Sequence, residues 1–89
     1  MSVKTDKLIY QLQQAQQLGQ SIVAIAGLAH LDLVYTFATT TTLVINCRNY
    51  SALWELDEAQ TRLRQAMHLM GLAITTIWIE KNGALAYEF

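Results

Sequence analysis

The sequence predicts an α+β fold: a two-layer sandwich in which two helices pack on an antiparallel sheet of four to five strands, in the order α-β-β-α-β-β. Three observations support this prediction. Two segments have the apolar spacing of helices, two others are rich in β-branched and aromatic residues, and an Asn-Gly pair separates the last two strands. Because a chain of 89 residues has room for one hydrophobic core, we expect a single domain over residues 1–89.

The first expected element is a helix over residues 4–18. Leu8, Leu12 and Ala15 recur at i, i+4 and i+7, and glutamines occupy much of the remaining surface. Gly19 is placed to end this helix, since glycine readily takes the left-handed conformation found at helix C-termini. The polar side of the helix carries amides instead of charges, which is compatible with a protein interface.

The segment 21–47 has the composition of β-strands, because Val, Ile, Thr, Tyr and Phe are frequent in it. Residues 31–47 predict a hairpin with a turn at 39–42 and one mainly polar face. Its other face is apolar and includes Tyr35, Phe37, Ile45 and Cys47. Residues 21–26 predict an extra strand ending at Gly27, and a short helix over 28–38 is the alternative for the middle of this segment.

A second helix is expected over residues 51–70, followed by Gly71. Leu53, Leu56, Leu63 and Met67 follow a spacing of three and four residues along it. Acidic residues near its start and basic residues later suit the helix dipole.

The chain ends with a predicted hairpin, in which residues 74–81 and 84–89 flank Asn82-Gly83. This pair favours a two-residue type I′ turn, because both positions need a positive φ. The ideal register places Trp78 opposite Tyr87, so that Trp78, Leu85, Tyr87 and Phe89 share one face while Ile77, Ile79, Ala84 and Ala86 share the other. Both faces are largely apolar, so either the helices cover one face each or a partner covers the second.

Composition favours a partner surface. Apolar residues make up 53% of the chain and charged residues only 15%, although a small domain has much surface for its volume. We expect a non-enzymatic protein-interaction module, which is either a small homodimer or a regulatory or adaptor subunit that binds another protein. The expected contact residues lie on the C-terminal hairpin and one helix: Trp78, Tyr87, Leu85, Phe89 and Trp54.

The alternative is a small-molecule-binding or enzymatic domain that uses the polar face of the central hairpin. His30, Asp32, Asn46 and Arg48 are its candidate ligand-site residues. An imidazole beside a carboxylate is suited to general acid-base chemistry, and an arginine can hold an anion.

Several classes of function have no support in the sequence. Net charge is −1 and the six basic residues are scattered, so we expect no nucleic-acid partner. His30, His68 and Cys47 are too widely spaced for a metal site, and we expect no cofactor. The most apolar stretch, residues 21–31, is too short to cross a membrane. A lone cysteine favours the cytoplasm, and Cys47 is expected in the core, where burial makes a thiol inert.

Overall fold

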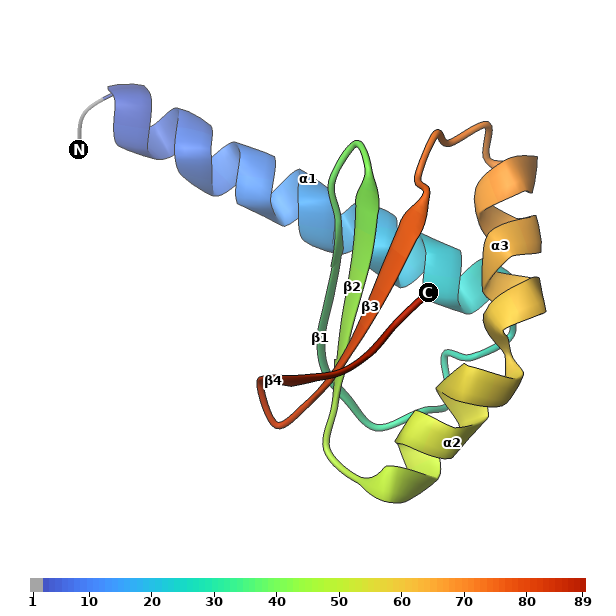
Figure 1. Cartoon of the computed structure of the whole chain (residues 1–89). Coiled ribbons are helices and arrows are strands. Elements are labelled where there is room, and N and C mark those ends of the chain that lie inside the picture. The colour runs from blue at the N-terminus through green and yellow to red at the C-terminus, as the bar shows by residue number, and fades with distance from the viewer. Residues whose placement is uncertain (1–2) are drawn as a thin grey trace.

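A computed structural model describes residues 3–89, with side chains from residue 6 onward. The described chain confirms the α+β class, with three helices and a four-stranded sheet (Figure 1). In chain order the elements are α1 (Val3–Ile25), β1 (Leu33–Ala38), β2 (Thr42–Cys47), α2 (Tyr50–Glu58), α3 (Gln60–Leu69), β3 (Thr76–Lys81) and β4 (Ala84–Glu88).

The sheet is mixed, so the prediction of a purely antiparallel sheet is wrong. Its strand order is β1-β2-β3-β4, and the two outer pairs are antiparallel hairpins. The central pair, β2 and β3, is parallel, with Leu43 beside Ile77 and Ile45 beside Ile79. The physical reason is the connection: α2 and α3 form a crossover that returns the chain to the end of the sheet where β2 began.

Helix α1 is longer than expected, since it continues through Gly19 to Ile25. The predicted helix end at Gly19 and the extra strand over residues 21–26 are therefore wrong. Gly19 is buried against β1, where an added Cβ would lie 2.7 Å from the backbone N and Cα of Phe37. Glycine is needed there for close approach, and the residue that ends α1 is Gly27, with φ of +79°.

Strand β1 replaces the alternative short helix over residues 28–38, and Leu33 faces the core as predicted, but after Leu33 the two faces of the strand are reversed from the prediction. A bulge between Leu33 and Tyr35 shifts the pairing with β2, so that Thr36 pairs with Ile45 and faces the helices. Tyr35 and Phe37 consequently lie on the other side of the sheet. The residues of β1 that face α1 are Thr36 and Ala38, and their small side chains allow the helix to approach closely.

The predicted second helix is two helices, which break at Ala59 (φ −95°, ψ 10°). No glycine or proline marks this break, so the apolar spacing runs straight through it. Asn49 caps α2, where its side chain accepts a hydrogen bond of 2.8 Å from the backbone N–H of Ala52. The break lets the buried residues of α2 and α3 reach the same core.

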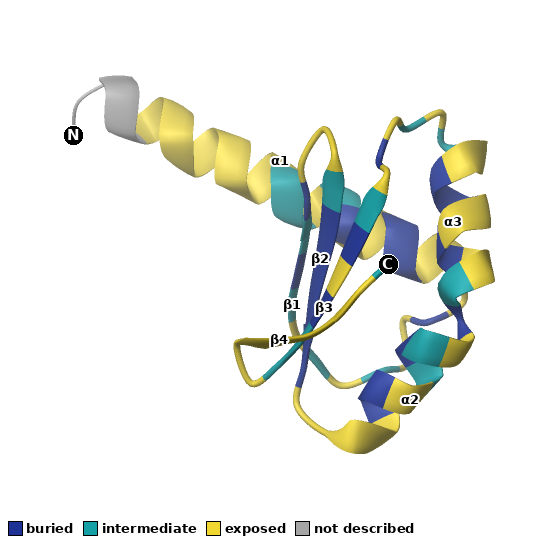
Figure 2. Ribbon diagram, in the orientation of Figure 1, coloured by how far each residue is buried: buried dark blue, intermediate teal, exposed yellow. Residues whose placement is uncertain are grey.

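The hydrophobic core lies between the three helices and one side of the sheet (Figure 2). Leu43, Ile45 and Cys47 of β2 are fully buried there, together with Ile77 and Ile79 of β3. From the helices, Ile22, Leu56 and Leu63 join them. In Figure 1, α1 crosses behind the strands while α2 and α3 stand beside them. Within the described residues, no helix combines the length and the apolar character that crossing a membrane requires.

Candidate functional site

The side of the sheet turned away from the helices is the candidate functional surface, which we call the open face. Strand pairing arranges it as two rows that cross the four strands: Tyr35, Asn46, Glu80 and Leu85 form one row, and Phe37, Val44, Trp78 and Glu88 form the other. Unlike its neighbours Leu43 and Ile45, Val44 is not part of the core cluster, although it is buried. Its neighbours across the sheet are the aromatic residues Phe37 and Trp78, which cover it on the side that no helix covers.

The C-terminal hairpin has the predicted turn but a different register beyond it. Asn82 and Gly83 have φ of 53° and 84°, as a type I′ turn requires. Glu80 pairs with Leu85 as predicted. A bulge follows, so that Trp78 pairs with Glu88, and the expected pair Trp78–Tyr87 is wrong.

This bulge divides the predicted interface residues between two sides of the sheet. A shift of one residue turns each later side chain of a strand to the opposite face. Trp78 and Leu85 lie on the open face, whereas Tyr87 and Phe89 lie on the helix side, where Phe89 packs against the core. Trp54 lies on α2, exposed and away from the open face.

Aromatic side chains from β1 extend the open face. The rings of Tyr35 and Phe37 are stacked, with centroids 5.9 Å apart. Because alternation placed both on the apolar, core-facing side of the hairpin, the sequence did not indicate them as surface residues. Trp78, 38% exposed, and Leu85, 54% exposed, complete the apolar part of the open face.

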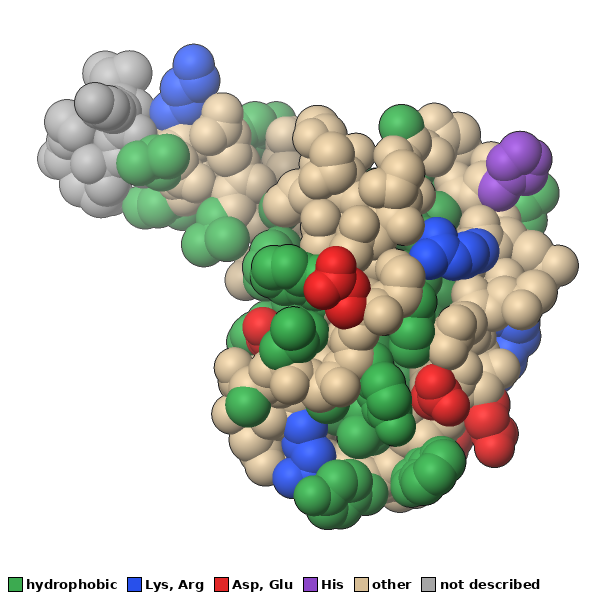
Figure 3. All heavy atoms as spheres, in the orientation of Figure 1, with side chains coloured by type: hydrophobic (Ala, Val, Ile, Leu, Met, Phe, Trp, Pro, Cys, Tyr) green, Lys and Arg blue, Asp and Glu red, His purple; other side chains and the backbone are tan. Residues whose placement is uncertain are grey.

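The charges on the open face are negative. The half-buried Glu80 accepts a hydrogen bond from the hydroxyl of Tyr35, and this bond, partial burial and the negative charge of Glu80 raise the pKa of Tyr35 above 10.0. Glu88 is exposed. Among the described residues the ion pairs are His30–Glu55 and Asp32–Arg48, so neither Glu80 nor Glu88 has a basic partner. Figure 3 shows carboxylates among hydrophobic side chains on this side of the molecule.

The predicted ligand-site residues do not form one cluster. Asp32 and Arg48 meet, with 3.1 Å between Oδ1 and Nε. His30 is instead tied to α2, where Nε2 lies 2.9 Å from Oε2 of Glu55. Asn46 is buried in the open face, and its Oδ1 accepts a 3.1 Å hydrogen bond from the backbone N–H of Gly83.

Cys47 is buried, as predicted, and burial is the main cause that raises the pKa of its thiol. The thiol donates to the carbonyl oxygen of Glu80 at 3.2 Å. Its inaccessibility and raised pKa both oppose nucleophilic reactivity at neutral pH. Within the described part of the chain, no three His, Cys, Asp or Glu side chains are arranged to hold a metal ion.

Comparison with known proteins adds no functional assignment: no protein-family model matches the chain, and neither a curated protein nor a solved structure matches it significantly. The functional argument therefore depends on the surfaces of the chain itself.

Proposed function

We propose that this chain is a non-enzymatic protein-interaction module, an adaptor or regulatory subunit whose open face binds a cationic, partly apolar segment of another protein. The observation that carries the proposal is the composition of the open face. It joins exposed aromatic and aliphatic side chains to two carboxylates that have no basic partner among the described residues.

The apolar part of the open face supplies the contact area. Trp78 and Leu85 are partly solvent-exposed, and the stacked rings of Tyr35 and Phe37 extend the same surface. Aromatic side chains lose little conformational entropy on binding and contribute strongly to protein interfaces. A partner that covers Trp78 would also cover Val44 and Phe37, its neighbours in the same row.

The charged part of the open face gives the proposal its specificity. Glu80 and Glu88 lie in neighbouring rows, each beside an aromatic residue or Leu85. An arginine or lysine of a partner could bind a carboxylate and pack over a ring face at the same time. An acidic partner would instead bring like charges together, which disfavours binding.

The small-molecule or enzymatic alternative has less support. It requires several polar groups that converge on one cavity. Of its four candidate residues, only Asp32 and Arg48 are in contact, while His30 and Asn46 bond to Glu55 and to the turn at Gly83.

The proposal can be tested with two short peptides, one of alternating arginine and leucine and one of alternating glutamate and leucine. In Trp54→Phe the only remaining tryptophan is Trp78, so its fluorescence reports directly on the open face. We expect the arginine peptide to change the emission of Trp78 saturably, more weakly at high salt, and the glutamate peptide to leave it unchanged.

Variants locate the binding surface when anisotropy of the labelled peptide is the readout. Trp78→Ala should weaken binding of the arginine peptide at least about tenfold, and Glu88→Gln about fivefold. Trp54→Ala is the matched control, because it removes the chain's other exposed tryptophan, and it should bind as the wild type does. Equal binding of both peptides, no binding of either, or an equal loss in Trp54→Ala would overturn the proposal.

A further inference from the structure

The N-terminal half of α1 extends past the edge of the sheet. Residues 6–14 are all exposed, and Figure 2 shows this part of the helix standing free of the strands. Leu8 and Leu12 are 61% and 56% exposed. A free helix of this length is marginally stable in water, so packing against another surface would stabilise it.

The exposed apolar residues continue the buried side of the same helix. Alternate spacings of four and three residues join Leu8, Leu12, Ala15, Gly19, Ile22 and Ala26 into one stripe. The last three pack into the fold, whereas the first two are exposed. Alternation of four and three residues is the pattern by which helices pair along a seam. The sheet covers only the C-terminal half of this stripe, which we call the seam.

The polar surface of α1 matches a copy of itself. The chain has no Asp, Glu, Lys or Arg between Lys7 and Asp32. After Lys7, glutamines supply most of the polar groups of α1, and each amide is both a donor and an acceptor of hydrogen bonds. Two identical amide-bearing helices can hydrogen-bond reciprocally and bring no like charges together along this segment.

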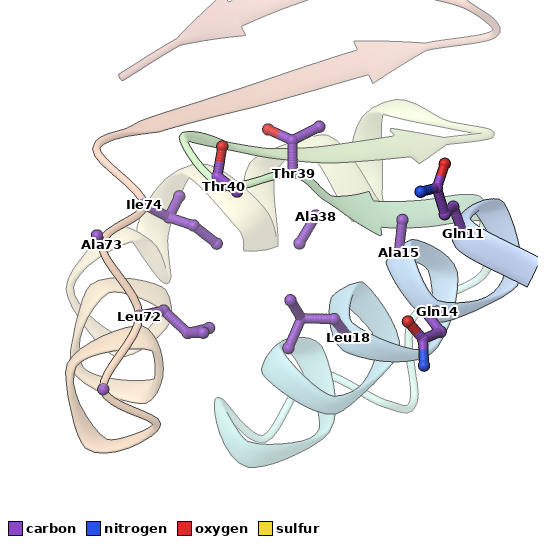
Figure 4. A pocket seen from close by; sticks show the side chains of 11 residues that line it. Gln11, Gln14, Ala15, Leu18, Ala38, Thr39, Thr40, Leu72, Ala73 and Ile74 are labelled. Atoms are coloured by element: carbon purple, nitrogen blue, oxygen red, sulfur yellow. The ribbon is translucent and has the colours of Figure 1, made fainter. Parts of the chain in front are cut away.

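A groove flanks the seam where α1 meets the sheet edge (Figure 4). It has a volume of about 450 Å³ and runs between α1, the turn after β1 and the loop before β3. Leu18, Leu72 and Ile74 line its floor, while Gln11 and Gln14 of α1 stand at its rim. Because α1 carries the seam and also forms one wall of the groove, an antiparallel partner helix on the seam would lie beside the groove.

We propose that two copies of the chain associate through α1, with the helices antiparallel about a two-fold axis. Leu8 of one copy packs on Leu12 of the other, so that the exposed half of each α1 lies along the other copy's α1, beside Gln11 and Gln14 at the rim of its groove. Such an interface is isologous and closed, so assembly stops at the dimer. The open face lies across the sheet from α1, so this inference is independent of the proposed function.

The contact is expected to be weak. Stable complexes typically bury ~800 Å² per partner, and because only one helix half takes part here we expect dissociation in the micromolar range. The monomer mass is 10.0 kDa, and light scattering over about a hundredfold dilution should show a mass falling from about twice this value to the monomer value. A monomer at every concentration up to the millimolar range would overturn the proposal.

Paired charge variants test the antiparallel arrangement. Leu8→Lys and Leu12→Glu should each be folded by circular dichroism, because both residues are exposed, and each alone should be monomeric. An equimolar mixture should dimerise, since one contact becomes a lysine-glutamate pair and the other is the original leucine pair. A parallel pairing would leave both contacts mismatched, so a mixture that stays monomeric contradicts the arrangement.

Two further variants separate this interface from the others. Tyr10→Lys adds a charge to the opposite side of α1 and should leave the dimer intact. Trp78→Ala alters only the open face and should also leave it intact. Loss of the dimer in either variant, or its persistence in both Leu8→Lys and Leu12→Glu, would place the interface elsewhere.

Discussion

The hydroxyl of Tyr35 on β1 donates a hydrogen bond to the carboxylate of Glu80 on β3, across the intervening strand β2. Asn46 lies between them in the same row. This contact joins two strands that share no backbone hydrogen bonds and orients both side chains along the open face. Because only the protonated hydroxyl of Tyr35 can donate this bond, deprotonation of Tyr35 would break a contact within the proposed binding surface.

The raised pKa of Tyr35 predicts a change of stability at high pH. The folded state disfavours the phenolate, so the stabilisation from Tyr35 is complete below its ordinary pKa of 10.0 and is lost as pH rises through the raised value. Urea unfolding of wild type and Tyr35→Phe should show a constant difference up to pH 10 and a shrinking one above it. Glu80→Gln should make this decline smaller, because it removes the main cause of the raised pKa of Tyr35, and a pH-independent difference in the wild type would contradict the hydrogen bond.

Gly19→Ala should destabilise the fold by about 1–3 kcal/mol, even though alanine favours helices over glycine by about 1 kcal/mol. The reason is the 2.7 Å approach of an added Cβ to the backbone of Phe37, which cannot move without shifting β1. Gln17→Ala is the matched control, because Gln17 is exposed on the same helix and its replacement should be neutral or slightly stabilising. Thermal unfolding of both variants measures the difference, and a stabilising Gly19→Ala would show that the close contact does not exist.

Asn46→Ala should cost about 1–2 kcal/mol of stability, because it removes the acceptor for the N–H of Gly83 at 3.1 Å. Arg48→Ala should cost less than about 1 kcal/mol, since its ion pair with Asp32 is exposed. Denaturant titration of both variants compares a structural asparagine with a surface arginine. If Arg48→Ala proved the more damaging change, the assignment of Asn46 as the structural residue would be wrong.

Cys47 should resist alkylation in the native state. Its thiol is buried and has a raised pKa, so reaction with iodoacetamide at neutral pH requires unfolding. Mass spectrometry should show alkylation in urea and almost none without it over the same time. Rapid modification of the folded protein would show that the thiol of Cys47 is accessible and able to act as a nucleophile.

The sequence predicted correctly those features that depend on residues close together in the chain. Asn82-Gly83 specifies its own turn because both residues tolerate positive φ, and the residues that pair closest to it follow. The β-branched and aromatic residues of β1 and β2 likewise predicted that these two segments are strands. Gly19 shows the limit of local signals, because a glycine that ends a helix and a glycine that admits a neighbouring strand look the same in sequence.

The candidate site was predicted only in part, because two bulges decide which side chains reach the open face. Trp78 and Leu85 were expected at an interface, but the bulge in the C-terminal hairpin replaced Tyr87 by Glu88 in that surface. The bulge in β1 likewise brought out Tyr35 and Phe37, which alternation had assigned to the core. A bulge adds one residue without a sequence signature of its own, so these positions could not be read from periodicity.

The central claim is that one side of the sheet is closed by helices and the other is free to bind. Trp78 and Ile79 are neighbours on β3 that point to opposite sides, so thermal unfolding of Trp78→Ala and Ile79→Ala measures this directly. Ile79→Ala should lose about 2–5 kcal/mol, and Trp78→Ala about 1 kcal/mol while staying fully folded. If Trp78→Ala destabilised the chain as much as Ile79→Ala, the open face would be core and the proposed binding surface would not exist.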